Sequence, residues 1–195
     1  MGFRRTLCPH CKRKLEAGQK LHPHCIDAYA EAEGAKAERK RQKQVRAAAK
    51  VQRAQDRQLR EAQKRIVDLK KEAQYEFNAF IRHRDKDKGC FVCGTPFPGN
   101  QHGGAFDAGH VRSCGAADHL RFNEDNCHGE CKSCNSSWGA KPHELEAGAI
   151  QRIGRERYEA LATNNARHKW THDELRSIRD HYRALNKQAK KEPTC

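Results

Sequence analysis

The sequence predicts a mostly helical α+β protein, in which a small zinc-bound module lies between a long basic helix and a helical C-terminal segment. Two Cys-x-x-Cys pairs, beginning at Cys90 and Cys131, enclose a segment long enough for a hairpin. Residues 29–88 contain no proline and are rich in Ala, Glu, Lys, Arg and Gln, a composition that favours helix. Only 36% of the residues are hydrophobic. We therefore expect bound zinc to supply stability that a large core would otherwise give.

Residues 1–28 are predicted to form a small zinc-binding motif. Four side chains of the types that bind zinc lie within 18 positions: Cys8, Cys11, His22 and Cys25. Three cysteines and one histidine are a common structural zinc set. His24 competes with His22 for the fourth place, and a flexible basic N-terminus with unliganded thiols is the alternative.

Residues 29–88 are predicted to form one long basic helix. Within 36–88, 18 Lys/Arg and 8 Asp/Glu give a charge of +10 out of the total of +14. The early part, residues 36–55, has eight basic residues and one acidic residue. Such a helix suits contact with DNA phosphates, which gives affinity without sequence information. The candidate contacts are Arg39, Lys40, Arg41, Lys43 and Arg46.

A heptad frame can be drawn along this helix, with Ala and Gln at the core positions of its first half and apolar residues prevailing in its second half. Its core positions would be Val45, Ala48, Gln52, Gln55, Leu59, Ala62, Ile66, Leu69 and Ala73. A single solvated helix and a coiled-coil homodimer over 59–80 both fit this pattern. The apolar side chains that follow are expected to dock the helix on the zinc module, namely Tyr75, Phe77, Phe80 and Ile81.

Residues 89–141 are predicted to form the zinc module. Its four thiolates are a tetrahedral zinc set: Cys90, Cys93, Cys131 and Cys134. The 37 residues between the pairs exceed the usual spacing of about 15–20, so they must build a structure of their own. We expect a β-hairpin with a first strand over 106–113, a loop over 115–121, and a helix from Asn135 to about residue 141.

The polar residues of this module follow a recognisable order: His110, Asn126, then Asn135 directly after the last cysteine. This order resembles the ββα-metal (HNH) nuclease fold in its zinc-stabilised form. The resemblance implies that His110 is a general base, that Asn126 orients the loop, and that Asn135 binds a catalytic Mg²⁺ or Mn²⁺. A histidine suits this role because its pKa lies near neutrality.

One position departs from the HNH pattern. Family members commonly have an aspartate ligand directly before the catalytic histidine, where this chain has Gly109. The nearest carboxylate, Asp107, lies on the same face of the strand about 7 Å away, because side chains alternate along a strand. Asp107 is therefore the candidate replacement for this metal ligand.

Other side chains of the module have less specific interpretations. Arg112 and Arg121 flank the candidate site and suit either a clamp on the scissile phosphate or an ordinary surface role. The histidines outside the motif are expected at the surface, namely His102, His119 and His128. Cys114 and Cys127 are expected to be small buried residues or free thiols.

A closer resemblance rests on four phrases: FNAFIRHRD (77–85), FDAGHVRS (106–113), LRFNEDN (120–126) and RHKWT (167–171). They resemble the NinG (Rap) family of lambdoid-phage recombination nucleases, which has Asp-Ala-Gly-His at the departing position. The resemblance implies a structure-specific endonuclease acting on branched DNA such as Holliday junctions and D-loops. The alternative is a non-catalytic, zinc-containing DNA-binding protein that assists recombination.

Residues 142–195 are predicted to be helical. Segments 144–153 and 155–163 are separated by Gly154, a C-cap residue. A capping box, Thr171-x-x-Glu174, begins the last helix. Trp170 precedes this box as a packing residue, and the helix carries an apolar stripe of Leu175, Ile178, Tyr182 and Leu185.

The net charge of +14 argues for a polyanionic partner. The chain has no run of about 20 apolar residues and no signal peptide, so DNA is preferred to a membrane. The ten cysteines occur largely in metal-binding spacings, which favours reduced thiolates. The resemblance to the NinG family implies a phage- or prophage-encoded protein that acts on branched DNA. With these features, we expect it in the bacterial cytoplasm, with no small-molecule substrate.

Overall fold

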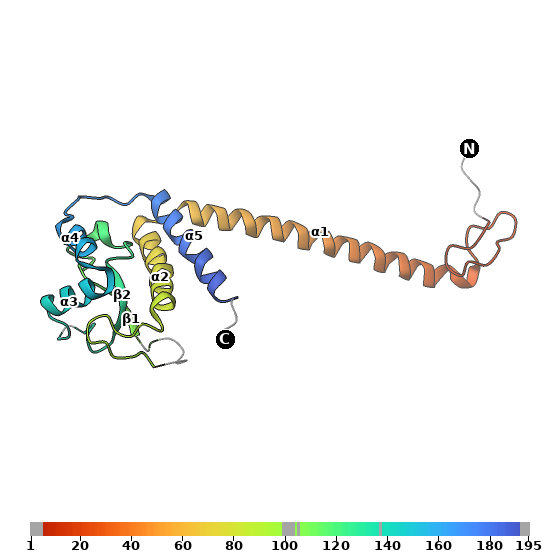
Figure 1. Cartoon of the computed structure of the whole chain (residues 1–195). Coiled ribbons are helices and arrows are strands. Elements are labelled where there is room, and N and C mark those ends of the chain that lie inside the picture. Colours follow the sequence, from red (N-terminus) through yellow and green to blue (C-terminus); the bar gives the residue numbers. More distant parts are fainter. Residues whose placement is uncertain (1–5, 99–103, 105, 137, 192–195) are drawn as a thin grey trace. The chain divides into compact units, whose positions relative to one another are not determined.

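The computed structural model describes residues 6–98, 104, 106–136 and 138–191, and it divides the chain into two compact units (Figure 1). The units are Met1–Gln63 and Lys64–Cys195. The predicted boundaries after residues 88 and 141 are therefore not boundaries between compact units. The helix before the zinc module and the helices after it form one unit with the module.

The first unit consists of a small Cys-rich knot and one long helix. The knot has an isolated bridge between Leu7 and Lys14 and a 3₁₀ turn, Pro23–Cys25. Its buried centre is formed by Cys8, Leu15 and Cys25. Helix α1 follows over Ile26–Ala62 and has no buried residue within this chain.

The long helix expected over 29–88 is in fact two helices. After α1 ends at Ala62, Arg65 adopts an extended conformation (φ −74°, ψ 154°), and α2 begins, spanning Ile66–Asp85. The guanidinium of Arg65 pairs with Asp68 in the first turn of α2. No proline or glycine lies at this break. Tertiary packing of α2 in the second unit therefore accounts for it, since such packing can override local helix propensity.

The same break interrupts the heptad frame over 59–80, which was one of the two alternatives for this segment. Its apolar positions Leu69 and Ala73 lie in α2, where they are fully buried against Leu175 of the same chain. The frame therefore crosses from one unit into the other. Tyr75 was expected to dock the helix but is 69% exposed, on the face of α2 that points away from this core.

The core of the second unit lies between α2 and the C-terminal helix α5, His172–Ala189, which runs alongside it (Figure 1). Phe77 and Ile81 are fully buried and pack with Tyr182, whose ring centroid lies 5.0 Å from that of Phe77. Phe80 packs against the same cluster. As predicted, a capping box begins α5, with the Thr171 hydroxyl accepting the Glu174 N–H.

A two-stranded antiparallel hairpin packs on α2. Strand β1 spans Phe106–His110 and β2 spans Cys127–Cys131, in a register that pairs His110 with Cys127. The first strand is shorter than the expected 106–113. The loop that joins the strands contains a 3₁₀ turn, Asp118–Leu120.

The helix expected from Asn135 to about 141 does not form, because the described residues of this segment make turns. The chain folds back on the last cysteine knuckle, where Ala140 donates its N–H to the Cys134 carbonyl at 2.9 Å. A Cβ on Gly139 would lie 2.0 Å from that carbonyl oxygen, so the turn requires glycine. Helix α3 begins only at Pro142.

Two short helices follow the turn. Helix α3 spans Pro142–Ile153 and α4 spans Arg155–Thr163, as predicted, with Gly154 at φ +86° between them. Among the described residues, no helix is both long and apolar enough to cross a membrane.

Candidate functional site

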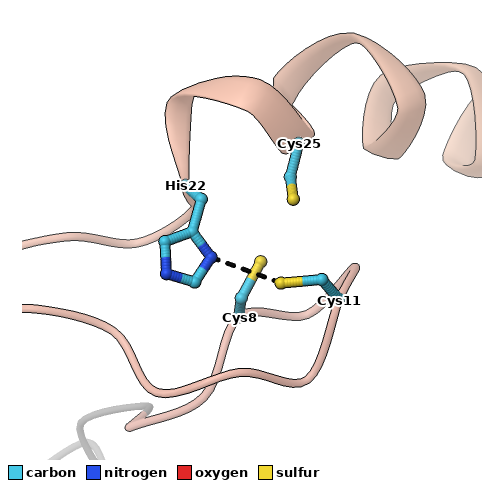
Figure 2. A group of neighbouring side chains, drawn as sticks. All are labelled: Cys8, Cys11, His22 and Cys25. Carbon is cyan, nitrogen blue, oxygen red and sulfur yellow. Dashed lines mark hydrogen bonds between the residues drawn. The ribbon is translucent and has the colours of Figure 1, made fainter.

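The first candidate metal centre lies in the N-terminal knot. The side chains of Cys8, Cys11, His22 and Cys25 point toward a common centre (Figure 2), and one ligand atom from each lies within 4.8 Å of the others. His22, not His24, completes the set, and His24 stacks on the ring of His22 at 5.3 Å. Three sulfurs and one imidazole nitrogen fit a closed tetrahedral zinc site.

The hydrogen bonds of this centre prepare His22 for a metal. Its Nε2 lies 3.1 Å from the carbonyl oxygen of Lys14, so Nε2 carries the proton and donates it. Nδ1 then keeps its lone pair and faces Cys11 Sγ at 3.3 Å. A backbone carbonyl that fixes the tautomer in this way is typical of metal-binding histidines.

The second candidate metal centre joins the two Cys-x-x-Cys pairs. The Sγ atoms of Cys90, Cys93, Cys131 and Cys134 lie within 4.8 Å of one another. Backbone N–H groups point at the sulfurs, from Cys131 to Cys90 Sγ at 3.3 Å and from Cys134 to Cys131 Sγ at 3.4 Å. Four thiolates fit structural zinc, which would tie the segment after α2 to the end of β2.

The loop between the strands is organised by Asn126, which is fully buried. Its Oδ1 accepts the backbone N–H of Arg112 at 2.8 Å, and its Nδ2 donates to the carbonyls of Arg112 and Leu120 at 3.0 and 3.1 Å. Both ends of the loop that follows β1 are thereby held by one side chain. The catalytic role that the HNH resemblance implies for Asn126 stays a prediction.

His110 is the last residue of β1, at the start of this loop. Its Nε2 donates to the carbonyl oxygen of Arg121 at 3.0 Å, so Nδ1 is the nitrogen with a free lone pair. The neighbour of Nδ1 is the Cys127 thiol at 3.8 Å, a weak donor. Burial lowers the pKa of His110, which keeps the ring neutral and able to accept a proton.

Asp107 and Asn135 are brought together by the fold. Asn135 Nδ2 donates to Asp107 Oδ2 at 3.2 Å, although the two residues are 28 positions apart. They lie at the face of the hairpin opposite the one where Ala108 packs into the core. A carboxylate and an amide are oxygen ligands of the kind that Mg²⁺ and Mn²⁺ prefer, once rotation of the amide presents its oxygen.

Glu130 lies on the same face of the hairpin as Asp107, although the HNH motif does not include it. It lies directly across the hairpin from Asp107, and its side chain is only 3% exposed. Its Oε2 would be 1.7 Å from a Cβ on Gly109, so the carboxylate fills the space where a side chain at 109 would lie. Burial, followed by the charge of Asp107, raises the pKa of Glu130 to about 7.

The arginines expected to flank the site are engaged within the protein. One guanidinium nitrogen of Arg112 donates to the carbonyls of Leu161 and Ala162 at the end of α4. Arg121 pairs with Asp118 at 2.6 Å and donates to Gln74 at 3.1 Å. A clamp on a phosphate would have to replace these bonds.

The basic residues expected to contact DNA all lie on the solvated helix α1. Arg41 pairs with Glu38 one turn away, an exposed pair of small energetic value. All five side chains are exposed, namely Arg39, Lys40, Arg41, Lys43 and Arg46. Within the first unit they form a charged segment of helix with no packing role.

The expectations for the histidines and cysteines outside the motif are met only in part. His128 was expected at the surface but is 1% exposed, because it packs against Phe91 and bonds the Asp125 carbonyl at 2.9 Å. Burial lowers its pKa to about 4. His119 is partly exposed and bonds the Asn164 carbonyl, while His102 lies outside the described residues. Both leftover thiols are free, Cys127 buried and Cys114 partly buried.

Together, the hairpin and the two Cys-rich centres define a basic α+β protein with two candidate zinc sites. The chain belongs to the NinG family: the family described as "Bacteriophage Lambda NinG protein" matches residues 2–192.

Three curated relatives illustrate the similarity. Protein ninG of Escherichia phage lambda is 42% identical over 114 residues, covering 57% of this chain and 52% of the relative. Protein ninG of Escherichia phage 933W is also 42% identical over 114 residues, with 57% and 53% covered. Protein ninG of Salmonella phage P22 is 38% identical over 112 residues, with the same coverage. The chain thus spans about half the length of the relatives it matches, and no solved structure matches it significantly.

Proposed function

We propose that this protein is a divalent-metal-dependent endonuclease that hydrolyses phosphodiester bonds in branched DNA during phage recombination, in the cytoplasm of the bacterial host. The observation that carries the proposal is the contact between Asp107 and Asn135, next to a strand that ends in His110. Structural zinc alone requires none of these three residues. The proximity of Asp107 and Asn135 supports a second, oxygen-rich metal site on one face of the hairpin, while His110 ends the same strand with its ring against Phe77.

In this mechanism His110 is the general base for the attacking water, and its Nε2–H remains bonded to the Arg121 carbonyl. Asn126 keeps that carbonyl in place indirectly, because it closes the loop that carries Arg121. A bound Mg²⁺ or Mn²⁺ would stabilise negative charge on the leaving oxygen. Asp107 and Asn135 would hold this ion through oxygen atoms.

Branched DNA is the substrate that the resemblance to recombination nucleases implies, and the charge of the chain supports a polyanionic substrate. The net charge of +14 favours a polyanion, and the exposed basic residues of α1 suit phosphate contacts that are independent of sequence. Such contacts give affinity for DNA of any shape, so selectivity for branches would have to arise elsewhere.

The test is cleavage of a labelled four-way junction beside a matched linear duplex, in Mg²⁺ and in Mn²⁺. We expect the wild type to cut the junction selectively, and His110→Ala to bind it without cutting. His143→Ala, which alters an exposed histidine in α3, is the matched control and should cut normally. Binding without cleavage by every variant would instead identify a DNA-binding protein that assists recombination without catalysis.

A further inference from the structure

The side chain of Glu130 occupies the space beside Gly109 that a side chain at position 109 would fill. In the hairpin, Gly109 lies diagonally across from Glu130, and the two residues share one face. The Oε2 atom of Glu130 and its Cβ would lie 1.7 and 2.9 Å from a Cβ on Gly109. The carboxylate is therefore delivered from β2 to the position that a side chain on β1 would otherwise fill.

This carboxylate belongs to a residue that is only 3% exposed, and among the described residues it has no hydrogen bond or ion pair. Five polar or charged side chains are buried in the described part of the chain: Asp85, Asn126, His128, Glu130 and Arg179. The other four have hydrogen bonds or ion pairs, and Asp85 alone receives three donors, from Arg84, Lys88 and Gly129. Within the described residues, no donor or cation meets Glu130, which is 3% exposed. A buried carboxylate is unfavourable unless an opposite charge compensates it.

The surroundings of Glu130 indicate what compensates it. Asp107 lies directly opposite on β1, and Asn135 is bonded to Asp107. Two carboxylates and an amide thus converge from both strands and from the turn after Cys134. Oxygen ligands of this kind select a hard divalent cation, whereas the nearby thiolates select zinc.

We propose that Glu130 is a ligand of the catalytic divalent cation and replaces a carboxylate at position 109. This inference rests on the proposed nuclease site, and it adds a residue from the second strand. The cation is held by Asp107, Glu130 and Asn135, with water completing its shell. Because Glu130 precedes Cys131 and Asn135 follows Cys134, the structural zinc positions two of the three ligands.

The experiment measures Mn²⁺ binding directly, by electron paramagnetic resonance of the free ion, with zinc-loaded full-length protein and no DNA. We expect Glu130→Gln to weaken Mn²⁺ binding at least tenfold while the zinc content stays unchanged. Glu156→Gln, an exposed position in α4, is the matched control and should bind as the wild type does. His110→Ala should also keep Mn²⁺ binding, because a proton acceptor need not hold the metal.

A second variant guards against misfolding of the first. Gly109→Ala keeps every carboxylate but forces the end of Glu130 aside, so it should also weaken Mn²⁺ binding. Gly109→Asp combined with Glu130→Ala moves the carboxylate back to β1 and should restore Mn²⁺ binding.

The outcomes separate this inference from the nuclease proposal. If Mn²⁺ binding depends on Glu130 but the protein cuts no DNA, Glu130 is supported as a metal ligand and the endonuclease proposal is overturned. If cleavage is metal-dependent but Mn²⁺ binding is unchanged in Glu130→Gln and Gly109→Ala, only the assignment of Glu130 as a metal ligand is overturned. If the wild type does not bind Mn²⁺, the assignment of Glu130 as a metal ligand is overturned as well.

Discussion

The carboxylate of Asp85, in the last turn of α2, accepts the backbone N–H of Gly129 in β2 at 2.8 Å. The neighbouring Arg84 donates to the Cys127 carbonyl, also at 2.8 Å, and pairs with Asp85. One end of α2 is therefore bonded to the second strand of the hairpin. The position of that strand, and of Glu130 within it, depends on a helix that carries no residue of the HNH motif.

Replacement of Asp85 should destabilise the second unit. The residue is fully buried, and Asp85→Ala would remove the carboxylate that accepts from Arg84, Lys88 and the Gly129 N–H, at a cost of about 3–5 kcal/mol. Thermal unfolding followed by circular dichroism at pH 7 measures the loss. Asp87→Ala, an exposed neighbour, is the control. Equal midpoints for the two variants would show that the Asp85 network does not hold the hairpin.

The effect of Asp85 should depend on pH. Burial acts to raise the pKa of this carboxyl, but hydrogen bonds from Arg84 and Gly129 outweigh it and the pKa is lowered. A lowered pKa in the folded state gives stability that is present above the unfolded value of about 3.9 and is lost as the pH falls below it. The difference in midpoint between wild type and Asp85→Asn should therefore narrow below about pH 4. A constant difference would contradict this assignment.

The two zinc centres should be separable. Cys11→Ala should reduce the zinc content from about two ions per chain to one and unfold only the first unit, since each centre draws all its ligands from one unit. Cys131→Ala should also leave one zinc but loosen the hairpin, and cleavage should be lost. Metal analysis and hydrogen exchange of the two variants measure these effects. Loss of both ions from either variant would contradict independent folding.

Local chemistry explains what the sequence predicted well. The spacing of cysteines identified both candidate metal centres, including the two cysteines 38 residues apart, Cys93 and Cys131. The glycine at 154 and the Thr171–Glu174 capping box marked helix ends, because these residues act on the backbone beside them. The spacing alone could not decide whether His22 or His24 belongs to the first centre, since both histidines fit it. The folded structure was needed to select His22.

The remaining features depend on contacts between distant segments. The break at Arg65 arises where α2 is drawn into packing with α5, 110 residues further along at Leu175. Glu130 faces Gly109 only because of the strand register, which a hairpin with a long loop does not specify. The burial of His128 likewise depends on Phe91, from the cysteine segment. No local signal in the sequence contains this information.

The basic segment of α1 should govern the salt dependence of DNA binding. Each phosphate contact contributes about 0.9 to the slope of log affinity against log salt, so loss of five contacts should lower it by up to about 4.5. The variant replaces five residues by Gln: Arg39, Lys40, Arg41, Lys43 and Arg46. Fluorescence anisotropy over a salt series measures the slope. Gln42→Ala with Gln44→Ala, in the same helix, is the control, and an unchanged slope in the five-residue variant would exclude this role.

The pH dependence of cleavage should report His110. Burial lowers its pKa from the usual 6.5, so the neutral, proton-accepting form persists to lower pH than for a solvated histidine. The cleavage rate should therefore rise with pH along an acid limb below 6.5 and then level off, measured in single-turnover assays with saturating Mg²⁺. His110→Ala should be slower by about 10²–10⁴, the usual contribution of a general base. An acid limb above pH 7, or an unchanged limb in His110→Ala, would assign the proton transfer to another group. Loss of the acid limb in His110→Ala would assign the proton transfer to His110, whose ring packs against Phe77 in the hairpin core.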